Sequence, residues 1–296
     1  MTLFSIPEVM HNHINSPSLP ENVMSINWNR VFLVVLYDKE IQDSQSISGI
    51  LQRDSGFCDD DLLILWNNGP TSLTDIFLNK DNIILINAIN NTCLPQIYNL
   101  FTHLRFGHII ILDHDTTVTN EFVKSTSKVI DGMIGLPTIT CDGHVEYPKE
   151  FKKPSRIKRT RRGPLRISVS SGLVISKKVC LMFIDEFGSV FDARFCFYGV
   201  DTSFFYRLQQ LNVDVEIVNL PAIEHDLSKL SEDANDSWRT QQRCQDFALQ
   251  LKYYYRVHWV VVLLLKNIFN DIRYTFTRKR SKYYNTLTLV KNMFFS

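Results

Sequence analysis

The stretch His108-Ile109-Ile110-Ile111-Leu112-Asp113-His114-Asp115-Thr116 leads from an apolar strand into two carboxylates one residue apart. Alternate side chains of a strand share a face, so Asp113 and Asp115 would point the same way if the strand continued. If the chain turns instead, both carboxylates still leave the end of a buried strand. Carboxylate oxygens are preferred ligands of hard divalent cations. The stretch predicts a strand that ends at a cation site, and the alternative interpretation is a pair of solvated turn carboxylates.

Apolar runs of the same kind recur along the first part of the chain. They cover Val31–Tyr37, Leu62–Trp66, Ile83–Ile86 and His108–Leu112. Short apolar runs bounded by polar turns indicate strands buried on both faces, and a helix is expected over Ser44–Gln52. Strands that alternate with helices are typical of an α/β fold with a parallel sheet.

Polar residues follow several of these runs. Because ligands bind beyond the carboxyl ends of parallel strands, the predicted sheet brings five polar side chains to one binding edge, namely Tyr37, Asn67, Asn68, Asp113 and Asp115.

Further elements are expected later in the chain. Ile167–Ser176 indicates a strand pair, or a strand whose glycine allows a close approach. A helix should begin at Asp201 or Thr202, and Val213–Val218 alternates as a strand does. A long polar helix is expected over Ser231–Tyr255.

Composition is that of an ordinary globular chain. Of its 296 residues, 45% are hydrophobic and 21% are charged, and the net charge of +1 gives no reason to expect a nucleic-acid partner. The six cysteines show neither a C-x-x-C pair nor regular spacing. We therefore expect no zinc site and no disulfide framework, but reduced thiols in a cytoplasmic protein.

The ends of the chain show no targeting or spanning segment. Met1–Arg30 lacks the basic start and long apolar run of a secretory signal, so residues 1–29 are expected to be a loose leader. The longest apolar run, Trp259–Leu265, has seven residues, whereas a helix needs about 20 to cross a bilayer.

Two segments are strongly basic. Lys149–Arg166 carries nine basic residues and one acid, which is typical of a solvated loop or of a flap that binds anions. Tyr253–Tyr284 combines aromatic, apolar and basic residues, as does an element that lies on an anionic membrane. The alternative for the second segment is a helix packed on the catalytic domain with a basic tail.

Six short motifs follow one another in this order: VVLYD, LWNNGP, LDHDTT, SSGLVIS, FDARFCFYGVDTSFFYRLQQLN and IEHDLS. Through these motifs, residues 30–230 resemble the bacterial family 2 glycosyltransferases, most closely their rhamnosyltransferase-like branch. The resemblance implies a GT-A fold with a Rossmann-like central sheet flanked by helices, a nucleotide-sugar donor, Mg2+ or Mn2+, and inversion at the anomeric carbon. Residues 231–296 would form a helical, basic and aromatic extension.

The resemblance also implies roles for single residues on the metal and catalytic side. Asp113 and Asp115 match the D-x-D motif, with Asp113 nearer the donor ribose and Asp115 on the metal. His225 matches a further metal or diphosphate contact, although a lone histidine is often structural. Asp201 matches the carboxylate that takes the acceptor proton, and a helix N-cap is its alternative role. Asp192 is a secondary candidate.

The remaining matches surround the two substrates. The resemblance places Tyr37 and Asp38 in the nucleobase pocket, with Asn67 or Asn68 where relatives often have an aspartate. Asn87 and Asn91 fall where relatives place asparagines around the donor, and helix capping is an equal alternative for them. On the acceptor side the small residues are Ser170, Ser171 and Gly172.

The function that follows is transfer of a sugar, with deoxythymidine-diphosphate-rhamnose as the expected donor, to a saccharide of an O-antigen or capsule. A polyprenyl-diphosphate-linked acceptor would bring the protein to the cytoplasmic face of the inner membrane. A sugar-phosphate nucleotidyltransferase would want a glycine-rich phosphate loop, which is not visible between Val31 and Arg53. A non-catalytic scaffold or lectin-like module is the alternative from another class, and nucleic-acid binding through Lys149–Arg166 lacks interleaved aromatic residues.

Overall fold

The computed structural model describes residues 19–74, 76, 80–152, 156–158, 164–227, 237–277 and 285–295. Most of the expected leader, residues 1–18, lies outside these ranges, as do parts of both basic segments. Within the described residues, a short helix α1 (Glu21–Ser25) precedes the first strand.

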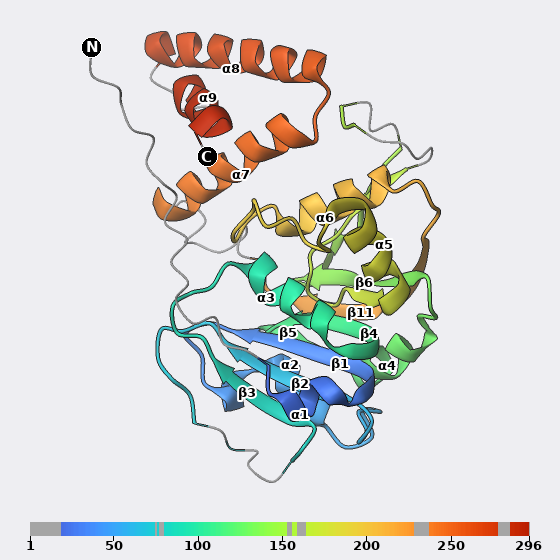
Figure 1. Ribbon diagram of the computed structural model, residues 1–296. Coiled ribbons are helices and arrows are strands. Elements are labelled where there is room, and N and C mark those ends of the chain that lie inside the picture. Colours follow the sequence, from blue (N-terminus) through green and yellow to red (C-terminus); the bar gives the residue numbers. More distant parts are fainter. Residues whose placement is uncertain are drawn as a thin grey trace, which may run out of the picture.

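A mixed central sheet forms the middle of the molecule, and Figure 1 shows helices on both of its faces. Nine strands of the described residues belong to it, in the order β3-β2-β1-β4-β10-β6-β11-β5, with β7 paired to β6. They are β1 (Asn27–Leu36), β2 (Leu62–Asn67), β3 (Ile83–Asn87), β4 (Arg105–Asp113), β5 (Thr116–Thr117), β6 (Met133–Cys141), β7 (His144–Tyr147), β10 (Val174–Ser176) and β11 (Glu216–His225).

The apolar runs form the parallel half of this sheet, as predicted. Strands β3, β2, β1 and β4 pair in parallel, with Val34 opposite both Leu65 and Leu112. Strand β10 runs antiparallel between β4 and β6, and β11 pairs with β6 in parallel. A separate two-stranded sheet joins β8 (Lys149–Phe151) to β9 (Leu165–Ile167) within the first basic segment.

The sheet has a hydrophobic core on each face because its central strands are buried on both sides. In β1, Leu33 and Val35 contribute to one core, and Phe32 and Val34 contribute to the other. The first core is covered by α3 (Leu94–Leu100), α5 (Lys177–Phe187) and α6 (Val200–Gln210), and the second by α2 (Gln45–Leu51) and α4 (Asn120–Ser125). Short 3-10 helices span Ile41–Asp43, Phe101–His103 and Thr126–Lys128. The α/β prediction is therefore confirmed.

The C-terminal part is helical, as predicted. It consists of α7 (Ser237–Tyr253), α8 (Val257–Thr277) and α9 (Thr286–Phe295), which lie together beyond α6 in Figure 1. Side chains from α7 and α9 share a small core of their own, to which α8 adds Val260, Leu263 and Leu264. None of the helices that the structure describes is both long and apolar enough to cross a membrane.

The bounds of one predicted strand were wrong, and several strands were not predicted. The last strand is Glu216–His225, so the predicted strand Val213–Val218 begins three residues too early and ends seven residues too soon, and His225 is the last residue of β11. Strand β6 was not predicted because Gly135 and Pro137 interrupt it, and both residues weaken sequence signals for a strand.

Candidate active site

The sheet topology brings the predicted metal ligands together at one edge. Asp113 is the last residue of β4 and pairs with Val35 of β1, and Asp115 follows in the turn before β5. Strand β5 pairs with β11, so that Thr116 lies opposite His225. This short pairing places the imidazole beside both carboxylates.

The carboxylates of Asp113 and Asp115 and the imidazole of His225 form a compact cluster. Nε2 of His225 is 3.6 Å from Oδ2 of Asp113, and its Nδ1 is 3.2 Å from Oδ1 of Asp115. One ligand atom from each residue lies within 4.8 Å of the others. The carboxylates are one-third exposed and the histidine is buried. Two carboxylate oxygens and an imidazole nitrogen suit Mg2+ or Mn2+, so the donor set fits the predicted metal.

The three side chains perturb one another's protonation. Burial raises the pKa of Asp113 to about 7; His225 opposes this, and the charges of Asp115 and Asp201 add to it. Burial also disfavours the charged form of Asp115, but its contacts with His225 and the charge of His114 hold its pKa below the ordinary value. Burial would lower the pKa of His225, yet the nearby carboxylates raise it overall. The cluster thus attracts positive charge, as a cation site should.

Two hydroxyls hold the histidine in position. Oγ1 of Thr116 lies 3.0 Å from Nδ1 of His225 and 2.6 Å from Oγ of Ser171. The backbone N–H of Asp113 donates to the same Ser171 hydroxyl at 3.1 Å. Thr116 was not among the predicted site residues, although it directly follows the D-x-D motif. Ser171, predicted on the acceptor side, is fully buried and supports the cluster of Asp113, Asp115 and His225.

The other predicted acceptor-side residues lie next to Ser171. Gly172 has a φ of +82°, and a Cβ there would lie 2.5 Å from Ile223 Cδ1 and Pro137 Cγ. A glycine is required by both conformation and space. Ser170 is 5% exposed, and its hydroxyl lies 3.4 Å from the hydroxyl of the buried Tyr98.

Asp201 lies in the first turn of α6, close enough for its charge to act on Asp113, His225 and Tyr98. It is not the N-cap, because that position is held by Gly199 with a φ of 74°. A Cβ on Gly199 would lie 1.5 Å from Oδ1 of Asp246 in α7. The glycine thus lets α7 pack on the start of the helix that carries Asp201.

Asp192 is bound by other side chains of the protein, which indicates a structural role. Its carboxylate is buried and forms ion pairs with Arg194 at 2.6 Å and Arg207 at 3.4 Å, and it accepts a hydrogen bond from Tyr254. Burial opposes its ionisation, but Arg194, Tyr254 and Arg207 together hold the pKa of Asp192 below its ordinary value. The network joins the loop before α6 to the end of α7.

Of the predicted nucleotide-side asparagines, Asn67 and Asn68 are buried and bonded to Asn87 and Asn91, which are more exposed. The Asn67 amide donates to Thr71 O at 2.6 Å and to Asn87 Oδ1 at 2.7 Å. The Asn68 amide donates to Asn91 Oδ1 at 3.1 Å, and its oxygen accepts from Thr92 N at 2.8 Å. These side chains shape the loops at this edge. A nucleobase could bond to the amides of Asn67 and Asn68 only if it replaced these hydrogen bonds.

Tyr37 and Asp38 are more open to a ligand. Tyr37 is 48% exposed, and Asp38 is exposed with a φ of 52°. The backbone N–H of Asp38 donates to Gly69 O at 2.8 Å, which ties the ends of β1 and β2 together.

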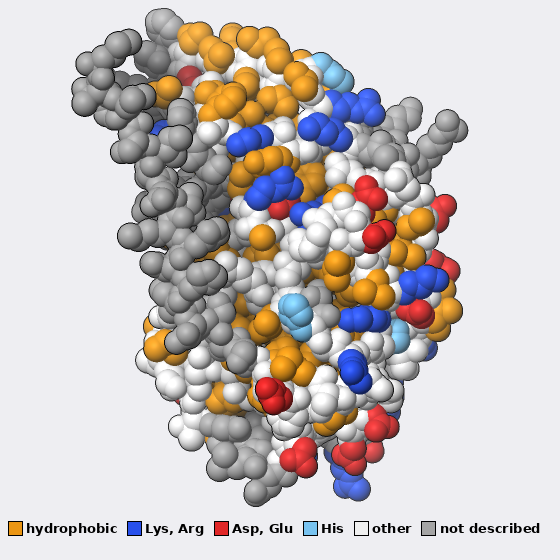
Figure 2. All heavy atoms as spheres, in the orientation of Figure 1, with side chains coloured by type: hydrophobic (Ala, Val, Ile, Leu, Met, Phe, Trp, Pro, Cys, Tyr) orange, Lys and Arg blue, Asp and Glu red, His pale blue; other side chains and the backbone are white. Residues whose placement is uncertain are grey.

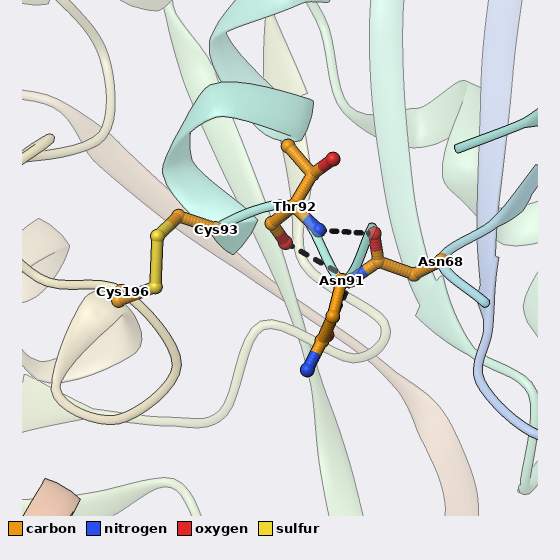
Figure 3. The surroundings of a disulfide bond; sticks show 5 residues. All are labelled: Asn68, Asn91, Thr92, Cys93 and Cys196. Carbon is orange, nitrogen blue, oxygen red and sulfur yellow. Dashed lines mark hydrogen bonds between the residues drawn. A yellow bond between two sulfur atoms is a disulfide. The ribbon is translucent and has the colours of Figure 1, made fainter. Parts of the chain in front are cut away.

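A disulfide between Cys93 and Cys196 corrects the expectation of reduced thiols. Its Cα atoms are 4.5 Å apart although 103 positions separate the residues in sequence. Figure 3 shows the bond beside Thr92, which hydrogen-bonds to Asn68. The spacing of the cysteines gave no signal because the fold alone brings these loops together. The cysteines therefore do not support a cytosolic location.

Two cavities differ in their relation to this site. One of about 250 Å³ adjoins the loop before Asp201; it is lined by Arg194, Phe195, Cys196, Phe197, Tyr198, Gln242, Gln245, Asp246, Leu249 and Tyr253. The other, of about 510 Å³, lies where β1 and β4 begin, at the opposite edge of the sheet, and includes His103, Arg105 and Lys177. The smaller cavity lies beside the loop that leads to α6, and its lining includes neither Asp201 nor a residue of the cluster.

No protein-family model and no curated protein sequence matches this chain. Several solved structures are similar to it at low identity. S. aureus TarS has a TM-score of 0.47 and 14% identity, over 76% of this chain and 44% of the TarS chain. S. aureus TarS 1-349 in complex with UDP-GlcNAc has a TM-score of 0.47 and 13% identity, over 76% of this chain and 67% of its own.

GalNAc-T7 with UDP, GalNAc and Mn2+ has a TM-score of 0.46 and 13% identity, over 79% of this chain and 49% of its own. This chain thus spans less than half the length of the TarS chain first mentioned and of GalNAc-T7. The scores and identities are too low to assign the chain to a family.

Proposed function

We propose that this protein is a metal-dependent glycosyltransferase of the GT-A type. The observation that carries the proposal is the cluster of Asp113, Asp115 and His225 at the carboxyl edge of the sheet, with the Asp201 charge acting on it. When bound, Mg2+ or Mn2+ would supply Lewis-acid stabilisation of charge on a departing diphosphate. Asp113, Asp115 and His225 would hold that cation.

The chain's own residues would supply the proton transfer. In an inverting displacement, the acceptor oxygen bonds to the anomeric carbon as the bond from that carbon to the diphosphate oxygen breaks. Asp201 would take the proton of the attacking hydroxyl, a role that typically contributes about 100- to 10,000-fold to the rate. Its position in the first turn of α6, beside a cavity and near the cluster, supports this assignment.

The donor would occupy the edge formed by the ends of β1, β2 and β3. The exposed Tyr37 and Asp38 are the side chains best placed to meet a base, and Asn67, Asn68 and Asn91 would shape the loops around it. Membership of family 2 and a deoxythymidine-diphosphate-rhamnose donor rest on the sequence resemblance.

The acceptor would approach from the cavity between the loop before α6 and α7. Its lining combines aromatic side chains with Gln242, Gln245 and Asp246, as ligand sites commonly combine apolar surface with a few polar groups. Ser171 and Gly172 are buried, so they would not contact the acceptor directly. We propose a polyprenyl-diphosphate-linked saccharide of an O-antigen or capsule as the acceptor, with residues 30–230 as the catalytic unit and 231–296 as an extension.

Calorimetric binding and hydrolysis of a panel of nucleotide sugars, with and without Mn2+, test this proposal. We expect metal-dependent binding and slow hydrolysis of one donor, which would also identify the sugar. Absence of donor binding under all conditions would overturn the enzyme proposal and favour a non-catalytic scaffold or lectin-like module. A nucleoside triphosphate and a sugar phosphate should give no pyrophosphate release; such release would indicate a nucleotidyltransferase instead.

A further inference from the structure

Helix α8 exposes an apolar face to the surroundings. Val257 is 75% exposed, Leu265 is 61% exposed and Phe269 is 66% exposed. Together with Val261, Val262, Ile268 and Ile272 they define what we call the outer face of α8. Their spacing of mostly three or four residues places them along one side of the helix.

The outer face is not needed to pack α8 onto the protein. Val260, Leu263 and Leu264 already contact the small core between α7 and α9. The helix is therefore apolar on two sides, one buried and one exposed. A contiguous exposed apolar patch commonly marks a surface that binds a partner or a membrane. Figure 2 shows this apolar band along α8 at the top of the molecule, with Lys and Arg side chains below it.

The surroundings of the outer face are basic because the structure joins the two basic segments. Arg256 N donates to Arg156 O at 2.9 Å, and Lys158 N donates to Tyr254 O at 2.7 Å. The Arg156 guanidinium lies 5.1 Å from the ring centroid of Trp259, the third residue of α8. The first basic segment thus adds Arg156 and Lys158 to the N-terminal end of α8.

Exposed basic residues also lie along the helix itself. Lys266 and Arg273 occur on α8, and both are exposed. The sequence of α8 contains one acid, Asp271, whose carboxylate accepts a hydrogen bond from Thr286 N at the start of α9. This hydrogen bond ties the acid to α9, and Lys266 and Arg273 are exposed on the helix that carries the apolar face.

From this arrangement we infer that the outer face of α8 binds the surface of an anionic lipid bilayer, with the helix lying in the interface. The 21 residues of α8 form a helix of about 30 Å, and its apolar side chains would enter the boundary between headgroups and acyl chains. Its basic neighbours would meet anionic headgroups.

A second copy of this chain fits the outer face less well. Two such faces in contact would bring the basic borders of both copies, which include Arg256, Lys266 and Arg273, close together. An anionic lipid surface offers both an apolar layer and the opposite charge. The inference does not depend on the proposed function, since the outer face contains no residue of the candidate active site.

Co-sedimentation of the full chain with vesicles tests the inference. We expect binding to phosphatidylcholine vesicles that contain phosphatidylglycerol, weaker binding to phosphatidylcholine alone, and further weakening as salt is raised. The double variant Leu265→Ser/Phe269→Ser should lower the partition coefficient by at least about tenfold, because it removes two large apolar side chains from the interface. Both side chains are exposed, so its thermal unfolding should match that of the wild type.

Two controls separate this surface from general stickiness and charge. Leu181→Ser/Ile130→Ser changes exposed apolar residues elsewhere and should bind vesicles as the wild type does. Arg256→Gln/Arg273→Gln should lose binding only where phosphatidylglycerol is present. Unchanged vesicle binding by Leu265→Ser/Phe269→Ser, or no binding by the wild type, would overturn the inference. The inference would also be overturned if the wild type formed a dimer and did not bind vesicles, and if Leu265→Ser/Phe269→Ser dissociated that dimer. The outer face would then be assigned to self-association.

Discussion

Nδ1 of His225, the last residue of β11, lies 3.2 Å from Oδ1 of Asp115, which follows β4. The contact joins two segments that meet only because the short strand β5 pairs with β11. It gives the D-x-D carboxylates a neutral or cationic nitrogen partner, which a bound cation would share.

Asp115→Ala should weaken Mn2+ binding by at least about 100-fold, because changes to residues behind metal ligands already cost about 10- to 100-fold. Calorimetric titration with Mn2+ alone measures this without a donor. Asp185→Ala, on the exposed side of α5, is the matched control and should leave the titration unchanged. Equal Mn2+ affinity in the Asp115 variant and the wild type would contradict the metal site.

Asp201→Asn should fold normally and lose sugar transfer by at least about 100-fold, because the amide cannot accept the acceptor proton. Steady-state transfer from the donor found in the panel measures the loss, and donor affinity should stay close to that of the wild type. Asp185→Asn serves as the control for loss of a carboxylate. A turnover number near the wild-type value in Asp201→Asn would show that another group is the base.

Asp192→Asn should destabilise the protein by about 3 to 5 kcal/mol at neutral pH, because Arg207 would remain buried without its partner charge. The folded pKa of Asp192 lies below its ordinary value of 3.8. Its stabilising contribution is therefore fully present above that value and is lost as the pH falls through the folded pKa. Urea unfolding should show a difference between variant and wild type that shrinks in strong acid. A difference independent of pH would contradict the assignment.

Loss of the Cys93–Cys196 bond should lower the free energy of unfolding by about 2 to 4 kcal/mol, since the bond closes a long loop in the unfolded chain. The variant Cys93→Ser/Cys196→Ser and the reduced wild type should unfold at similarly lower urea concentrations. Cys58→Ser, at an exposed free thiol, should behave as the oxidised wild type. Peptide mapping without reductant should recover the linked pair. Identical unfolding with and without reductant would count against the bond.

The sequence predicted those parts of the fold in which local pattern and tertiary burial agree. The runs at Val31, Leu62 and His108 are largely buried on both faces, and the run at Ile83, in the edge strand β3, is partly buried. Continuous apolar residues signal that situation directly. Strand β6 escaped prediction because Pro137 and Gly135 weaken its local signal while neighbouring strands on both sides hold it in the sheet.

The grouping of Asp113, Asp115 and His225 followed from residue type and motif order, whereas the side chains that support it could not be predicted. Thr116 and Ser171 meet only after β10 and β11 take their places in the sheet, and neither residue type alone indicates such a contact. The burial of Asn67 and Asn68 depends on loops that follow other strands. The disulfide was missed for the same reason, because its two cysteines have no relation in sequence.

The disulfide also changes what a cut in the backbone would do. The first basic segment, with many sites for trypsin, lies between Cys93 and Cys196 in the chain. A nick there would leave two fragments covalently joined, and they would migrate as one species on a denaturing gel until a reductant is added. Clipping in this segment would therefore go unnoticed in any preparation analysed only under non-reducing conditions.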